Sequence, residues 1–162
     1  MSRPLVILGS ARADGETGRA VSFAFPDGAD LVVLPQYKIG GYDYAHSNEG
    51  DDFAGIATRM QQARAIVFAT PVYWYAMSAP LKFFFDRLTD LTENLKSTGK
   101  ALAGKPVWLI ATGTEPELPE GFEVPFRRTA DYFGMRYCGA IYAVAGAQDA
   151  AALARFGARI SA

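Results

Sequence analysis

Apolar residues along the chain fall into five short runs, separated by segments with helical periodicity. The runs cover residues 4–9, 29–34, 65–70, 107–112 and 135–144. Short continuous runs of this kind are typical of parallel strands that helices cover on both faces. Pro71 follows the third run, and we expect it to end that strand.

Between these runs, apolar side chains recur every three or four residues, as they do on one face of a helix. The predicted helices cover residues 17–25, 51–64, 120–133 and 147–159, and a longer one follows Ser78 and keeps its apolar face as far as Leu95. We expect Ser78 to cap that helix, with Pro80 in its first turn. The alternation predicts one doubly wound α/β domain over residues 1–162, with a five-stranded parallel sheet in the order 2-1-3-4-5 and helices on both faces.

The composition argues against several classes of protein. Half of the residues are hydrophobic and the formal net charge is -1, which does not suit a disordered chain or a polybasic nucleic-acid binder. Cys138 and His46 are each the only residue of their type, so we predict no disulfide and no metal site, and we interpret His46 as a solvated loop residue. No apolar run approaches the roughly 20 residues of a membrane span, and no signal peptide is evident, so we expect a cytoplasmic protein.

The first apolar run leads directly into Gly9-Ser10-Ala11-Arg12-Ala13-Asp14-Gly15-Glu16-Thr17-Gly18. Backbone N–H groups, hydroxyls and a helix amino terminus can converge on a phosphate in such a loop. The loop lacks both the dinucleotide fingerprint and the nucleoside-triphosphate motif. The Glu16 carboxylate would repel a phosphate unless it turned outward or paired with Arg12 or Arg19.

The third apolar run leads into an aromatic loop, Thr70-Pro71-Val72-Tyr73-Trp74-Tyr75, before the predicted helix, which contains Phe84-Phe85-Asp86-Arg87. Ligands of open α/β sheets bind where strands end and helices begin. These aromatic side chains could also be ordinary surface or core residues. Together with the Gly9–Gly18 loop, however, the segment resembles the flavodoxin-like NAD(P)H-dependent FMN reductases and quinone reductases.

The resemblance implies a flavodoxin-like fold and an enzyme with FMN as cofactor and NADPH or NADH as hydride donor. It also implies a ping-pong reaction with a small acceptor such as a quinone, free flavin or nitroaromatic, and a homodimer or homotetramer. No catalytic acid or base is required. The resemblance places the cofactor against Ser10, Arg12, Gly15, Thr17, Pro71, Val72, Tyr73, Trp74, Tyr75, Ser78, Thr112 and Gly113.

Two other functions remain open from the sequence. The first is a flavodoxin-type electron carrier that docks on a protein partner, although such carriers are strongly acidic as a family and this chain is not. The second is a flavodoxin-like binding module without flavin, for which Glu16 is the only hint. The polar segment 36–52 is long for a loop in a compact domain, so it could border the flavin, form a subunit interface or be a surface excursion.

Overall fold

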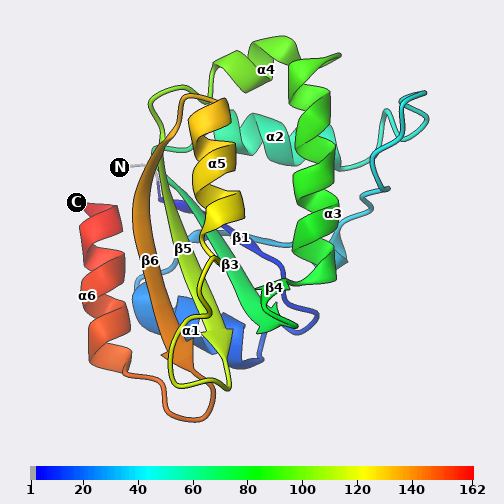
Figure 1. Ribbon diagram of the computed structural model, residues 1–162. Coiled ribbons are helices and arrows are strands. Elements are labelled where there is room, and N and C mark those ends of the chain that lie inside the picture. Colours follow the sequence, from blue (N-terminus) through cyan, green and yellow to red (C-terminus); the bar gives the residue numbers. More distant parts are fainter. Residues whose placement is uncertain (1–2) are drawn as a thin grey trace.

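A parallel sheet forms the centre of the protein, seen in a computed structural model that describes residues 3–162 (Figure 1). Its five long strands are β1 (Leu5–Leu8), β2 (Asp30–Val33), β3 (Ile66–Tyr73), β5 (Pro106–Gly113) and β6 (Arg136–Val144). They pair in the order β2-β1-β3-β5-β6, all parallel. The predicted doubly wound sheet and its strand order are confirmed.

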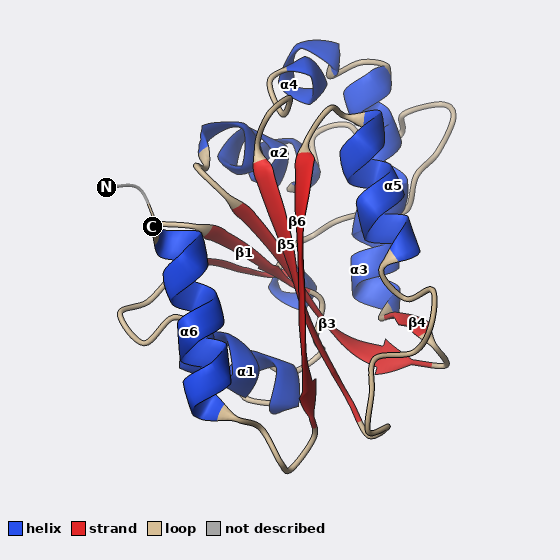
Figure 2. Cartoon of the chain, turned by 60° about the vertical axis from the view of Figure 1, so that its left-hand side comes forward, coloured by secondary structure: helices blue, strands red, loops and turns tan. Residues whose placement is uncertain are grey.

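Helices cover both faces of this sheet (Figure 2). One face packs against α1 (Glu16–Ala24) and α6 (Ala150–Ser161), and the other against α2 (Phe53–Gln62), α3 (Ala79–Arg87) and α5 (Val124–Tyr132). Leu5 and Ile7 of β1 face the second group, whereas Val6 and Leu8 face the first. Both sides of each central strand are therefore buried, which explains the continuous apolar runs in the sequence.

The prediction that Pro71 ends the third strand is wrong. β3 continues to Tyr73, with Pro71 opposite Thr112 of β5. On its other side, β1 ends at Leu8, opposite Ala69, so Pro71 lies where β3 no longer has β1 as a neighbour. A proline is tolerated at such a position because its missing N–H leaves no ladder bond unmade. The extension then turns back as a two-residue strand, β4 (Ala76–Met77), which pairs antiparallel with the end of β3.

The prediction of one helix reaching Leu95 is also wrong. α3 ends at Arg87 and is followed by a 3-10 segment, η2 (Leu88–Thr92), and a short helix, α4 (Lys96–Lys100). The Thr92 hydroxyl donates to the carbonyl of Thr89, and side-chain bonds of this kind compete with the α-helical ladder. Leu88 and Leu91 are nevertheless buried. The apolar periodicity therefore predicted the buried face correctly, but it did not predict the change from α-helix to 3-10 helix.

The other predicted helices differ from the structure mainly at their ends. α5 begins at Val124 instead of residue 120, because Pro125 lies in its first turn, where proline needs no N–H partner. α6 begins at Ala150, capped by the side chain of Asp149, which accepts from the N–H of Ala152 at 2.9 Å. Within residues 3–162, no helix has the length and apolar character required to cross a bilayer.

Segment 36–52 begins in the 3-10 turn η1 (Leu34–Gln36) and then packs along α3 and η2. The buried guanidinium of Arg87 pairs with Asp51 and donates to the carbonyl of Gly40. His46 is only 28% exposed and lies against η2, so its interpretation as a solvated loop residue is wrong. Its partners come from a distant part of the chain, which the local polar pattern could not indicate.

Candidate functional site

A cleft of about 370 Å³ opens where β1, β3 and β5 end. It lies at the switch point of the sheet, because β1 leads to α1 on one face and β3 leads to α3 on the other. Nine of the twelve residues predicted from the sequence line it: Ser10, Arg12, Gly15, Thr17, Pro71, Val72, Tyr73, Thr112 and Gly113.

One end of the cleft is formed by the amino terminus of α1. No side chain caps this helix at Gly15, so the N–H groups of its first turn are open to an anion. The hydroxyls of Ser10 and Thr17 lie at the same end, and Thr17 Oγ1 is 2.6 Å from Thr112 Oγ1 on β5. The loop is packed tightly onto α1, since a Cβ on Gly18 would lie 1.7 Å from the carbonyl oxygen of Ala13.

Arg12 is the cation at the mouth of this cleft. Its side chain is 75% exposed, and Nε lies 3.3 Å from Asp14 Oδ1. The hydrogen bond and positive charge of Arg12 hold the pKa of Asp14 below its ordinary value. The guanidinium therefore has a carboxylate partner in this structure, and a phosphate in the cleft would compete with Asp14 for it.

Glu16 also lines the cleft, and its carboxylate is held by three neighbouring groups. Its Oε2 accepts from the N–H of Gly146 and from Gln148 Nε2, both at 2.9 Å, and Oε1 pairs with Arg19 at 2.9 Å. The hydrogen bond from Gly146 is the main reason that the pKa of Glu16 is lowered. Glu16 therefore meets one of the conditions set out from the sequence, the pairing with Arg19, and this pairing weakens the electrostatic objection to a bound phosphate.

The aromatic loop is the tip of the hairpin between β3 and β4. Trp74 and Tyr75 form its two-residue turn with φ of 49° and 64°, in the left-handed region that glycine and asparagine favour. Their side chains are 93% and 67% exposed. Two large aromatic residues thus occupy a strained and exposed turn, a combination typical of functional sites.

A smaller cavity of about 150 Å³ lies under this hairpin. It adjoins the cleft, because Val72, Gly113 and Thr114 line both, and Trp74 and Tyr75 border it. Tyr142 of β6, which the sequence interpretation missed, also lines it and donates through Oη to the carbonyl of Glu115 at 2.9 Å. The only feature of the sequence that could have indicated this role was the hydroxyl of a tyrosine near the end of the last strand.

Ser78 lies outside both cavities. Its buried hydroxyl donates to the carbonyl of Gly9 and accepts from the N–H of Leu81, so it fastens the start of α3 to the end of β1. The predicted cap is confirmed. The side chain has a packing role and is not directly in the cleft.

The adjoining cavities suit a phosphate monoester that is joined to a flat aromatic group. The anion would meet N–H groups, two hydroxyls and Arg12, and the flat group would lie between Gly113 and the hairpin. A Cβ on Gly113 would lie 2.7 Å from Tyr142 Oη, so a larger residue at 113 would require the Tyr142 side chain to shift. Two other shallow clefts, of about 420 and 460 Å³, lie beside Tyr132 and Phe133, and none of the twelve residues predicted from the sequence lines either of them.

Comparison with known proteins identifies the ligand that this chemistry fits. The family model for NADPH-dependent FMN reductase matches residues 3–149. The chain belongs to this family. The predicted enzyme class, an NAD(P)H-dependent FMN oxidoreductase with FMN as its cofactor, is confirmed at this level.

Individual relatives agree in sequence and in fold. The Bacillus subtilis (strain 168) protein YwqN, provisionally named an NAD(P)H-dependent FMN-containing oxidoreductase, is 28% identical over 145 residues, which is 83% of this chain and 80% of YwqN. The Trp repressor binding protein of Bacillus subtilis has a similar fold, with a TM-score of 0.76, 23% identity and coverage of 95% and 97%. General stress protein 14 of Treponema denticola, solved in complex with FMN, gives a TM-score of 0.66 at 21% identity, with coverage of 98% and 95%.

Proposed function

We propose that this member of the FMN reductase family passes electrons from NADPH or NADH to a small acceptor, such as a quinone, free flavin or nitroaromatic, in a ping-pong order. The observation that carries the proposal is the shape of the site. Ser10, Thr17 and Thr112 at the phosphate end are buried, whereas Trp74 and Tyr75 on the other side are exposed. With one open side, donor and acceptor would occupy the same place in turn.

Some residues of the site would hold FMN, and others would orient the substrate. Ser10, Thr17, Arg12 and the open end of α1 would bind the phosphate of FMN. The main chain from Pro71 to Tyr73 and the glycine at 113 would bring backbone close to the ring system, and the hairpin aromatics would orient a flat substrate. When bound, FMN supplies the hydride-accepting and electron-transferring chemistry, so no side-chain acid or base is assigned.

The structure argues against one of the two alternative functions, and kinetics would test the other. The flavin-free binding module depended on repulsion between Glu16 and a phosphate, and Glu16 is instead bonded to Gly146, Gln148 and Arg19. An electron carrier that docks on a protein would reduce free quinone slowly without its reductase. The cytoplasmic location and the homodimer or homotetramer stay predictions.

Steady-state kinetics test this proposal. With NADPH and a soluble quinone varied together, the double-reciprocal lines should be parallel. Trp74→Ala should lower kcat/KM for donor and for acceptor together, each about fivefold, as expected for about 1 kcal/mol of aromatic stacking. Tyr132→Ala removes another exposed aromatic residue, which lies beside a different cleft, and should change neither value of kcat/KM. Intersecting lines, or a loss confined to one substrate, would contradict a shared site.

A further inference from the structure

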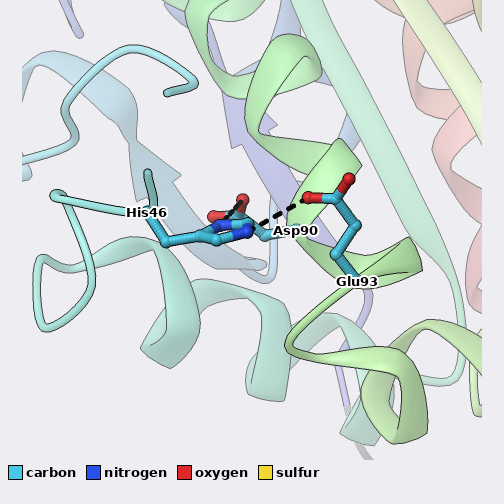
Figure 3. Close-up of side chains that lie close together, drawn as sticks. All are labelled: His46, Asp90 and Glu93. Atoms are coloured by element: carbon cyan, nitrogen blue, oxygen red, sulfur yellow. Dashed lines mark ion pairs between the residues drawn. The ribbon is translucent and has the colours of Figure 1, made fainter. Parts of the chain in front are cut away.

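His46 lies between two carboxylates of the segment that follows α3 (Figure 3). Its Nδ1 is 3.4 Å from Asp90 Oδ1, and its Nε2 is 3.3 Å from Glu93 Oε2. One ring nitrogen and one oxygen from each carboxylate lie within 4.8 Å of one another. The three residues, called the His46 cluster below, join the 36–52 segment to η2 and the residue after it.

Both carboxylates are held in place by a further side chain. Asp90 is 7% exposed and receives a hydrogen bond from Arg87 Nε on Oδ2 at 2.9 Å, so its Oδ1 remains directed toward His46. Glu93 Oε2 accepts from the hydroxyl of Tyr42 at 3.1 Å. Contacts of this kind orient the ligands of metal sites in proteins.

One atom in the cluster has no adequate partner. Nδ1 of His46 is buried and takes part in no hydrogen bond, because its approach to Asp90 is long and poorly aligned. A buried nitrogen without a partner is unfavourable in a folded protein, and it calls for an explanation such as a bound ion. A cation between the ring and the carboxylates would provide the missing interaction.

We propose that the His46 cluster binds a divalent transition-metal ion of the Zn²⁺ type, through one imidazole nitrogen and two carboxylate oxygens. Imidazole with carboxylate suits zinc and its neighbours, whereas Mg²⁺ and Ca²⁺ prefer oxygen ligands alone. Ligand atoms around tetrahedral zinc lie about 3.4 Å apart, so the widest separation in the cluster has to shrink by about 1.4 Å at most. Glu93 is partly exposed and can make this adjustment by side-chain rotation.

The position of the cluster indicates a structural role for the ion. α3 begins beside the β3–β4 hairpin and runs away from it, and η2 follows the far end of α3 (Figure 1). The cluster is therefore remote from the cleft and cannot contact a flavin there. An ion at this point would clamp the 36–52 segment onto η2, adding to the ion pair between Asp51 and Arg87.

Calorimetric titration of tag-free, EDTA-treated protein with ZnCl₂ tests the proposal. We expect one equivalent to bind with micromolar affinity and MgCl₂ to bind at least 100-fold more weakly. His46→Gln and Glu93→Gln should each lower the affinity for Zn²⁺ at least tenfold. Glu49→Gln removes an exposed carboxylate from the same segment and should leave the affinity unchanged. Equal zinc affinity in all of these proteins would overturn the proposal.

A measurement on the unmodified chain avoids any dependence on the folding of variants. His46 is the only histidine, so the imidazole signals in a long-range ¹H–¹⁵N NMR spectrum report on this cluster alone. Saturating Zn²⁺ should shift one ring nitrogen strongly and leave the other N–H protonated. Ring nitrogens that do not respond to 1 mM Zn²⁺ would show that His46 only bridges the two carboxylates as an ion pair.

Discussion

One side chain, Arg12, supplies the positive charge at the mouth of the cleft. Among the described residues that line the cleft it is the one cation, and its present partner, Asp14, is exposed and in competition with any bound anion. Exposed ion pairs contribute little to folding, whereas a charge-assisted bond to phosphate contributes about 1.5–3 kcal/mol. Arg12 is therefore expected to act on binding and hardly at all on stability.

Arg12→Ala should raise the Kd for FMN about 10- to 100-fold and change the free energy of unfolding by less than about 0.5 kcal/mol. Fluorescence titration of FMN and urea denaturation measure the two quantities. Arg155→Ala, which removes an exposed arginine from α6, serves as the control for a lost positive charge. An unchanged Kd in Arg12→Ala would rule out the phosphate assignment.

Single residues were predictable from the sequence where their partners are local. Ser10 directly follows one buried run and Thr112 ends another, so the sheet itself carries them to the cleft, and Thr17 lies in the first turn of the helix that follows the first run. Tyr142 was not predictable, because its hydroxyl is used by a loop carbonyl after another strand. His46 was misinterpreted for the same reason, since only the folded chain brings η2 to it.

At the scale of elements, the β3–β4 hairpin combines backbone strain with exposed aromatic side chains. A turn of this type normally carries Asn-Gly, and a left-handed conformation in other residues is unfavourable by about 1 kcal/mol or more. Trp74 and Tyr75 contribute little buried surface in return. The strain is consistent with a turn selected for its side chains rather than for stability.

The double variant Trp74→Asn/Tyr75→Gly should raise the free energy of unfolding by about 1 kcal/mol, because it relieves this strain. It should also lower kcat/KM for the hydride donor. Chemical denaturation and steady-state assays on the same samples measure the two effects. A variant that is less stable than the parent would show that the aromatic side chains support the fold.

The Asp51–Arg87 pair fastens the 36–52 segment to α3. Burial disfavours the charged form of Asp51, but the hydrogen bond from Arg87 and those from the N–H groups of Gly40 and Phe53 outweigh it, so the pKa of Asp51 is lowered. A carboxylate with a lowered pKa stabilises the folded state above its ordinary pKa of 3.8. That contribution is lost as the pH falls through the lower pKa of the folded state.

Asp51→Asn should therefore lower the free energy of unfolding by about 3 kcal/mol at pH 7, because it leaves Arg87 buried with one carboxylate fewer. The difference from the parent should shrink below about pH 4. Urea denaturation at pH 7 and pH 3 measures it. Asp86→Asn breaks the exposed pair with Lys82 and should have an effect below about 0.5 kcal/mol at both values. A difference for Asp51→Asn that does not vary with pH would contradict the assignment.

Elements were predictable to the extent that burial defines them. The five strands follow from apolar runs that alternate with helical periods, and their order is the flavodoxin-like order of doubly wound sheets. The β3–β4 hairpin could not be predicted from the sequence, because Trp74-Tyr75 lacks the usual turn residues and Pro71 suggested an earlier end to β3. The break after α3 was missed because η2 keeps the same buried face as a continuing helix.

At the scale of the whole molecule, one sheet brings two loops together that are far apart in the sequence. The Gly9–Gly18 loop and the β3–β4 hairpin each had an ordinary structural explanation alone. The two loops meet at the switch point of the sheet. This arrangement, together with membership of the FMN reductase family, identifies the cleft as the candidate FMN site. The 36–52 segment is on the outer side of α3, and the residues that line the cleft come from other parts of the described chain.

The most direct test of the central claim is the visible absorption spectrum of the protein loaded with FMN, followed anaerobically. Addition of NADPH or NADH should bleach the flavin band, and a stoichiometric amount of quinone should then restore it without any protein partner. The preferred donor is the one that bleaches the band faster. A protein that binds no FMN at saturating concentration, or bound flavin that neither nucleotide bleaches, would contradict the account.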